Sequence, residues 1–130
     1  MRAILTNPYL LVLVGGGVGS LLRYQAARWI PSTVSGVGFP SAILLVNVLA
    51  SGILGIVMGW ALSRSGSSDE LRLLLGVGFC GGLSTFSTFS MDTMLLLQNG
   101  RWGAALLNIS LNVICCLLAS AVGFWLGQKL

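Results

Sequence analysis

The chain has 130 residues, of which 55% are hydrophobic and only 8% are charged, and its mean hydropathy is +0.93. Soluble domains carry about 25% charged residues, so this chain cannot cover a water-exposed surface and is expected to form one compact membrane domain, residues 1–130. Its net charge of +4 comes from scattered Lys and Arg residues. Nucleic-acid binding needs a clustered basic patch, so we exclude a nucleic-acid partner.

Polar and turn-forming residues divide the chain into four apolar segments. These run over about Pro8–Trp29, Ser41–Leu62, Leu71–Leu97 and Trp102–Leu126. Each segment is long enough to cross a hydrocarbon core of about 30 Å at about 1.5 Å per residue. We therefore expect an all-α membrane protein with four transmembrane helices and with both termini on one side of the membrane.

Each segment carries two glycines four residues apart, a spacing that allows two membrane helices to approach closely. The pairs are Gly15 and Gly19, Gly55 and Gly59, Gly78 and Gly82, and Gly123 and Gly127. Chance spacing is the alternative, because the chain has 18 glycines and glycine is frequent in membrane helices. We favour close packing of the helices.

The basic residues are nearly balanced between the two sides of the membrane. With four spans, one side receives Arg2, Arg64, Arg72 and Lys129, and the other receives Arg23, Arg28 and Arg101. An excess of Lys and Arg on one side normally fixes the orientation, so this balance predicts insertion in both directions. A single, weakly biased orientation is the alternative.

The third segment contains the run GFCGGLSTFSTF, residues 78–89. Glycines followed by hydroxyl residues in the middle of a span predict a broken helix. The freed carbonyl groups must then be buried in protein or line a wet cavity, and a bound monovalent cation is one way to satisfy them. The alternative is an unbroken packing face whose hydroxyl groups bond back to their own helix.

This run resembles the third-helix motif of the fluoride channel family (Fluc, also called CrcB). The segment from Gly15-Gly16 through Gly19 to Arg23-Tyr24 resembles that family's first-helix GGxxGxxxRY pattern, and Val46-Asn47 resembles its second-helix VN. Chain length and helix count also match, so the resemblance covers essentially the whole chain. Ser84 stands where the family usually has Thr, but the family uses the backbone carbonyl at this position.

The resemblance implies an antiparallel, dual-topology homodimer that exports fluoride through two pores in the inner membrane of a bacterium. A central structural sodium ion would be held by the backbone carbonyls of Gly81 and Ser84, and Arg23 would lie at the vestibule. The fluoride pathway would be lined by Asn47, Thr85, Phe86, Ser87, Thr88, Phe89, Asn108, Asn112 and Cys116. The last three share one helix face, and their asparagines replace the more usual hydroxyl residues.

The chemistry of these residues agrees with an anion pathway, because amides, hydroxyl groups and the positive edges of aromatic rings all attract fluoride. The main alternative is a small multidrug antiporter, which exchanges protons for cationic drugs through a central carboxylate. Asp92 is the only acid inside a predicted span, and we expect it to be paired or interfacial. A structural subunit would leave the polar residues in mid-membrane unexplained. An enzyme is excluded, because a chain without His and with three acids offers no general-base constellation.

Overall fold

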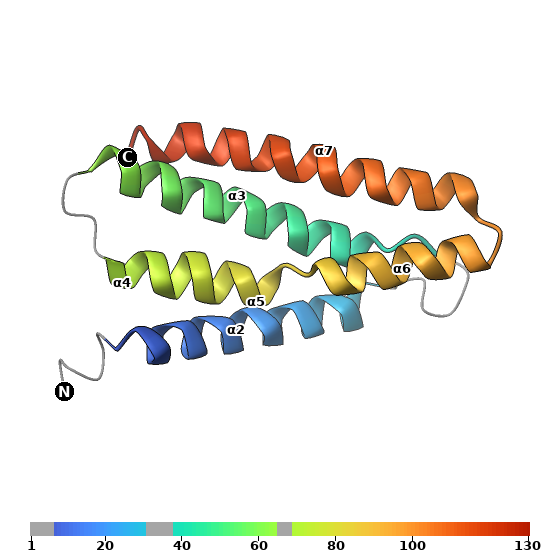
Figure 1. Cartoon of the computed structure of the whole chain (residues 1–130), viewed down its shortest axis with the longest axis horizontal. Coiled ribbons are helices and arrows are strands. Elements are labelled where there is room, and N and C mark those ends of the chain that lie inside the picture. Colours follow the sequence, from blue (N-terminus) through green and yellow to red (C-terminus); the bar gives the residue numbers. More distant parts are fainter. Residues whose placement is uncertain (1–6, 31–37, 65–68) are drawn as a thin grey trace.

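The computed structural model describes residues 7–30, 38–64 and 69–130, which form four helical rods lying side by side (Figure 1). The first two rods are α2 (Pro8–Trp29) and α3 (Ser41–Ser63). The third rod comprises α4 (Asp69–Leu71), η2 (Arg72–Cys80), α5 (Gly81–Leu83) and α6 (Phe86–Gln98), and the fourth is α7 (Trp102–Gly127). All four rods are long and apolar enough to cross a membrane, and the described residues contain no strand. The predicted all-α, four-helix fold is confirmed.

The rod ends follow from local signals in the sequence. Asn7 caps α2, because its side-chain oxygen accepts hydrogen bonds from the N–H groups of Tyr9 (3.0 Å) and Leu10 (3.4 Å). The third rod begins at Asp69, two residues before the predicted start, because acidic residues are favourable in the first turn of a helix. Gly100 turns the chain between α6 and α7 with a positive φ of 70°.

Paired cationic and aromatic side chains lie at the end of the bundle where α3 ends and α7 ends. The Lys129 ammonium group lies 3.3 Å from the centre of the Trp125 ring, and the Arg64 guanidinium lies 6.0 Å from that of Trp60. Arg64 also donates a hydrogen bond to the Leu130 carbonyl. Such pairs are typical anchors at a membrane–water interface.

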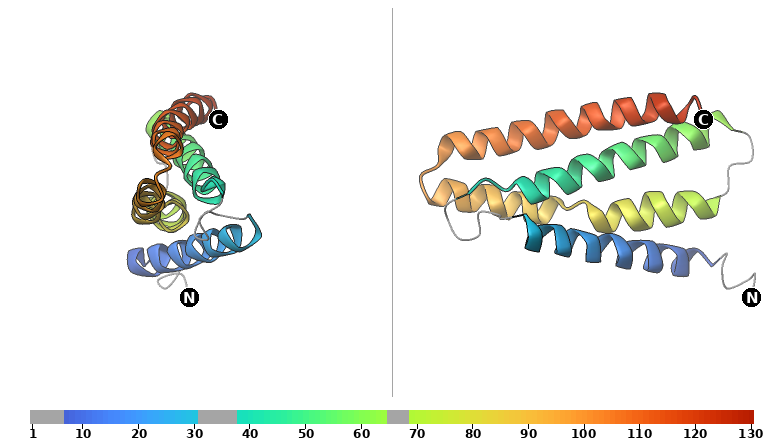
Figure 2. Two further views of the ribbon diagram at one scale, coloured as in Figure 1. Left: turned by 90° about the vertical axis from the view of Figure 1, so that its right-hand side faces the viewer. Right: turned by 180° about the vertical axis from the view of Figure 1, so that it is seen from behind.

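The rods are arranged in the order α7, α3, third rod and α2 across the molecule, with α2 crossing the others obliquely (Figure 2). Between α3 and the third rod lies a small apolar core, formed by Val46, Ala50, Cys80 and Leu83. Many other large apolar side chains face outward, as expected of helices surrounded by lipid.

The predicted glycine pair of α2 packs directly against the glycine pair of the third rod. A Cβ atom on Gly15 would lie 3.2 Å from the Cα of Gly78, and a Cβ atom on Gly19 would lie 2.2 Å from the carbonyl oxygen of Phe79. A Cβ atom on Gly82 would lie 2.3 Å from a carbonyl oxygen of α2. The two backbones therefore touch with no side chain between them.

A second contact of the same kind joins α3 to α7. A Cβ atom on Gly55 would lie 2.4 Å from the carbonyl oxygen of Ser120, and one on Gly59 would lie 2.2 Å from that of Phe124. From the other side, Cβ atoms on Gly123 and Gly127 would each lie 2.2 Å from carbonyl oxygens of α3. The four glycine pairs thus build two interfaces, and their predicted role in close packing is confirmed.

The third rod is broken near its middle, as predicted. Ser84 (φ −76°, ψ 155°) and Thr85 (φ −153°, ψ 118°) are extended and separate α5 from α6. The break directly follows the glycines that pack against α2. The alternative was an unbroken helix face of small residues. In the structure, residues 78–89 pack against α2 through their glycines and also contain the break.

Gly19→Ala should destabilise the protein, because the added methyl group meets backbone atoms that cannot rotate away. Overpacking of this kind costs about 1–3 kcal/mol of unfolding free energy. Gly17→Ala is the matched control on the same helix, because a Cβ atom there would meet nothing within 4 Å. Thermal unfolding in detergent, followed by circular dichroism, measures both. Equal midpoints for the two variants would contradict the close contact.

Candidate functional site

The break in the third rod leaves backbone groups without helical partners. The Ser84 N–H and hydroxyl both donate to the Cys80 carbonyl, at 3.0 and 2.9 Å, and so complete the last turn before the break. The carbonyl oxygens of Gly81 and Ser84 accept no hydrogen bond from residues 7–30, 38–64 or 69–130. These two carbonyls, which were predicted to hold a sodium ion, are therefore free to bind a ligand.

Arg23 reaches the break from α2. Its Nε donates to the Gly82 carbonyl oxygen at 3.1 Å, and the hydroxyl of Ser20, one turn earlier, lies 3.5 Å from the same oxygen. The predicted position of Arg23 at a vestibule stays a prediction. What the structure adds is a contact in which Arg23 satisfies one of the carbonyls freed by the break.

Asn47 reaches the break from α3 and holds both backbone groups of Thr85. Its side-chain oxygen accepts from the Thr85 N–H (2.8 Å), and its side-chain nitrogen donates to the Thr85 carbonyl (3.4 Å). The Asn47 side chain thus supplies an acceptor for the Thr85 N–H, which has no helical partner at the break. Its nitrogen adds a bond to the Thr85 carbonyl, which as the N-cap carbonyl also begins the hydrogen bonds of α6.

The Thr85 hydroxyl caps the N-terminus of the next helix, α6. It accepts from the Thr88 N–H at 3.2 Å, as an N-cap does, and lies 3.1 Å from the hydroxyl groups of both Ser87 and Thr88. The four predicted hydroxyl residues thus serve different local functions. Ser84 ends one helix, while the other three form a cluster at the start of α6.

A row of hydrogen-bonded side chains, here called the amide ladder, leads away from Asn47. The Asn47 nitrogen donates to the Asn112 side-chain oxygen (2.9 Å), the Asn112 nitrogen to that of Asn108 (3.0 Å), and the Asn108 nitrogen to the Thr93 hydroxyl (3.0 Å). Asn108 is 1% exposed and Asn112 is 6% exposed. The ladder joins α3, α7 and α6 through the interior of the protein.

Thr93 completes the ladder but was not among the predicted site residues. Its sequence signal was its position four residues after Phe89, which places it on the same face of the helix as a predicted pathway residue. Recognising it also required knowing that α6 packs on α7.

A cavity of about 250 Å³ lies beside the break and gathers most of the predicted pathway residues. It is lined by Asn47, Ser51, Ser84, Thr85, Phe86, Phe89, Asn112, Val113 and Cys116. The rings of Phe86 and Phe89 are tilted by 52°, with their centres 5.4 Å apart. Ser87, Thr88 and Asn108 do not line this cavity, although each is hydrogen-bonded to a residue that does.

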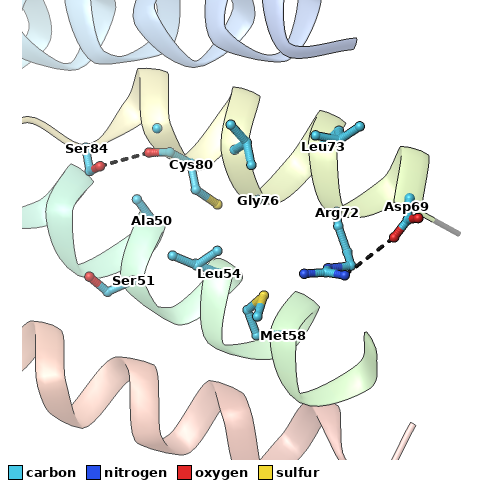
Figure 3. Close-up of a pocket in the computed structure, with 12 residues that line it drawn as sticks. Ala50, Ser51, Leu54, Met58, Asp69, Arg72, Leu73, Gly76, Cys80 and Ser84 are labelled. Carbon is cyan, nitrogen blue, oxygen red and sulfur yellow. Dashed lines mark hydrogen bonds and ion pairs between the residues drawn. The ribbon is translucent and has the colours of Figure 1, made fainter. Parts of the chain in front are cut away.

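A second cavity, of about 640 Å³, lies between α3 and the third rod (Figure 3). Gly81 and Ser84 line one end of it, and the ion pair of Arg72 with Asp69 (3.4 Å) lies at the other. Its walls are otherwise mostly apolar, and a Cβ atom on Gly81 would meet nothing within 4 Å. Ser51 and Ser84 line both cavities, so the two spaces lie against the same part of the break.

Asp92 is buried (5% exposed), and its Oδ2 has no hydrogen-bond partner among the described residues. It was predicted to be paired or interfacial, and within the described residues it is not paired, because Arg72 and Asp69 form the only ion pair there. An interfacial position stays a prediction. The basic residue nearest the end of α6, Arg101, donates instead to the Gly38 carbonyl at 3.0 Å. Asp92 lines neither cavity.

Asn47→Leu should leave the Thr85 N–H without its hydrogen-bond partner, because leucine keeps the volume of asparagine but offers no acceptor. Each buried polar group left without a partner costs about 1–3 kcal/mol. We expect a lower unfolding temperature and faster hydrogen exchange of the Thr85 amide. Ser51→Ala is the control one turn further along α3. If exchange at Thr85 were the same in wild type and Asn47→Leu, Asn47 would not hold the break.

Comparison with known proteins agrees with this architecture. Residues 10–124 match the family described as CrcB-like protein, Camphor Resistance (CrcB). A "Fluoride-specific ion channel FluC" from Pyrococcus furiosus is 46% identical over 119 residues, covering 92% of this chain and 94% of the relative. Proteins of the same name from Shewanella frigidimarina (46% over 122 residues, 93% of each chain) and Shewanella baltica (45% over 125 residues, 95% of each chain) are similarly close. This chain is therefore a multi-pass membrane protein that belongs to the CrcB family.

Proposed function

We propose that this protein is a fluoride-selective ion channel that exports fluoride and so relieves fluoride toxicity. The observation that carries the proposal is the cavity of about 250 Å³ beside the helix break, where Asn47 and Asn112 meet the rings of Phe86 and Phe89. The names of relatives that are 45–46% identical over almost the whole chain support the same activity.

The lining of this cavity suits a small, strongly hydrated anion. Fluoride gives up water only where hydrogen-bond donors replace it, and amide groups, hydroxyl groups and the positive edges of aromatic rings are such donors. No carboxylate is among the lining residues. A carboxylate in this lining would repel a fluoride ion bound beside it, because two like charges at close range raise each other's energy.

The alternative of a proton-coupled multidrug antiporter has less support. Such a transporter needs a carboxylate that is open to both proton and drug, and Asp92, the only acid within the described middle of a span, lines neither cavity. A channel is not an enzyme, and no catalytic constellation is needed for passive movement of an ion.

A second copy of the chain, packed antiparallel, is the partner that we propose for the larger cavity. A Cβ atom on Gly81, which lines this cavity, would meet nothing within 4 Å, and the walls of the cavity are mostly apolar. Phe86 is 78% exposed although it lies in the middle of a span. The near balance of basic residues between the two sides supports opposite orientations of the two copies, and such a dimer would contain two pores.

A sodium ion fits between the two copies. Neutral carbonyl oxygens suit a monovalent cation, whereas a divalent ion would call for carboxylates. Gly81 and Ser84, whose carbonyls accept no hydrogen bond from the described residues, line the larger cavity, and the same pair from the second copy would complete the coordination shell. The ion would have a structural role in holding the two breaks together. We place the dimer in the inner membrane of a bacterium, in line with the relatives from Shewanella.

Phe86→Ile and Phe89→Ile should sharply reduce fluoride flux from liposomes while the protein still folds. Isoleucine keeps an apolar volume but lacks the positive ring edge that attracts an anion. We expect about a tenfold loss of flux, which corresponds to about 1.4 kcal/mol. Wild-type protein should pass fluoride and not chloride, as measured with ion-selective electrodes.

The matched control is Phe124→Ile on α7, since Phe124 lines neither cavity. Folded Phe86→Ile and Phe89→Ile variants that carry fluoride at the wild-type rate would show that the rings only pack. A wild-type protein that carries no fluoride would contradict the channel itself.

The antiparallel dimer predicts two measurable properties. Reporters fused to the C-terminus that work on only one side of the membrane should both give a signal, because both orientations are present. Replacing sodium with choline should lower the thermal stability of the purified dimer, because choline is too large for a carbonyl site. A single-sided reporter signal would contradict the antiparallel arrangement, and a dimer that is equally stable in both salts would contradict the ion site.

A further inference from the structure

The amide ladder has a direction that its first residue imposes. The Thr85 N–H can only donate, so the atom of Asn47 that faces it must be the oxygen. The Asn47 nitrogen then faces Asn112, which must present its own oxygen. The same requirement passes on to Asn108, whose oxygen accepts from the Asn112 nitrogen. From this end, every amide is turned the same way.

The other end of the ladder imposes the same direction independently. The Thr93 hydroxyl donates its single hydrogen to the Phe89 carbonyl at 2.8 Å. Toward Asn108 it therefore offers only an oxygen lone pair, which the Asn108 nitrogen meets at 3.0 Å. The hydroxyl of Thr93 and the peptide of Thr85 thus fix opposite ends of one oriented row.

A single amide in this row cannot turn over alone. A turned Asn112 would place two nitrogens against each other on one side and two oxygens on the other. Asn108, Asn112 and Thr93 are all less than 9% exposed, so water does not replace the lost bonds. Buried polar groups without partners are costly. Asn47 is fixed by the Thr85 N–H, and Asn112 is fixed by the Asn108 backbone carbonyl, which also accepts from its nitrogen at 3.0 Å. The Asn108 side chain is fixed only by Asn112 and Thr93.

We propose that Thr93 is a positioning residue for the fluoride pathway, which it serves by fixing the Asn108 side chain at the end of the amide ladder. This inference rests on the proposed channel function. Through the Asn108 side-chain oxygen, Thr93 supports the amide of Asn112, which lines the cavity beside the break together with Asn47. The longest bond of the row, from the Asn47 nitrogen to the Thr85 carbonyl (3.4 Å), is the one that an entering anion can replace most easily.

Thr93→Val tests the proposal, because valine keeps the shape of threonine without the hydroxyl; Thr93→Ala makes the same loss if the valine variant does not fold. Ser90→Ala is the matched control. Ser90 also bonds back to the carbonyl four residues earlier, at 2.9 Å to Phe86, but it does not contact the ladder. Thr93→Ser retains the hydroxyl and should restore the wild-type behaviour.

The first readout is NMR of the asparagine side chains in protein labelled with nitrogen-15 asparagine. In Thr93→Val, the side-chain resonances of Asn108 and Asn112 should both shift, whereas in Ser90→Ala and Thr93→Ser they should not. If only Asn108 shifts, Thr93 merely packs against its neighbour and the proposal is wrong. This readout does not depend on which ion the protein carries.

The second readout is fluoride flux in liposomes. Removing one buried hydrogen bond is worth about 1 kcal/mol, so Thr93→Val should reduce the flux about fivefold. A Thr93→Val protein with shifted Asn112 resonances and wild-type flux would contradict the link from ladder to pathway. Wild-type liposomes that carry no fluoride would instead contradict the proposed function, and the NMR experiment alone would then decide the role of Thr93 in the ladder.

Discussion

The structure depends on one constraint: backbone groups that leave a helix in the middle of a membrane must find partners inside the protein. The extended residues Ser84 and Thr85 break the third rod, and side chains from two other rods satisfy the freed groups. Arg23 donates to the Gly82 carbonyl, and Asn47 bonds to both the N–H and the carbonyl of Thr85. Gly81 and Ser84, whose carbonyls accept no hydrogen bond from the described residues, line the larger cavity. The break therefore organises the contacts between the rods.

The glycine interfaces make these contacts possible. Arg23 can reach a backbone carbonyl of the third rod because α2 lies against that rod without intervening side chains. The same close approach of α7 to α3 places Asn112 within hydrogen-bond distance of Asn47. Two backbone contacts thus bring polar groups from three helices to one break. The small residues set how closely the helices pack, and the polar residues form hydrogen bonds across the short distances that result.

The sequence was most informative where a property belongs to a single segment. The four spans follow from hydropathy and turn residues, and the break follows from glycine and hydroxyl residues within one run, residues 78–89. The sequence did not predict which two glycine pairs face each other, because this depends on how whole helices pack. Thr93 was missed for the same reason, since its role exists only where α6 meets Asn108. Asp92 was expected to be paired or interfacial, but the basic residue nearest to it in the sequence binds a backbone carbonyl instead.

The fixed direction of the amide ladder has an electrical consequence. Each side-chain amide is a dipole, and the dipoles of Asn47, Asn112 and Asn108 lie head to tail, with their oxygen ends toward the break. A single subunit therefore carries a built-in polarity along this row. Hydroxyl groups in the same places could reverse by rotation, but amides held by backbone groups cannot. In the proposed antiparallel pair the two rows would point in opposite directions, so their dipoles would cancel and neither face of the assembly would be electrically preferred.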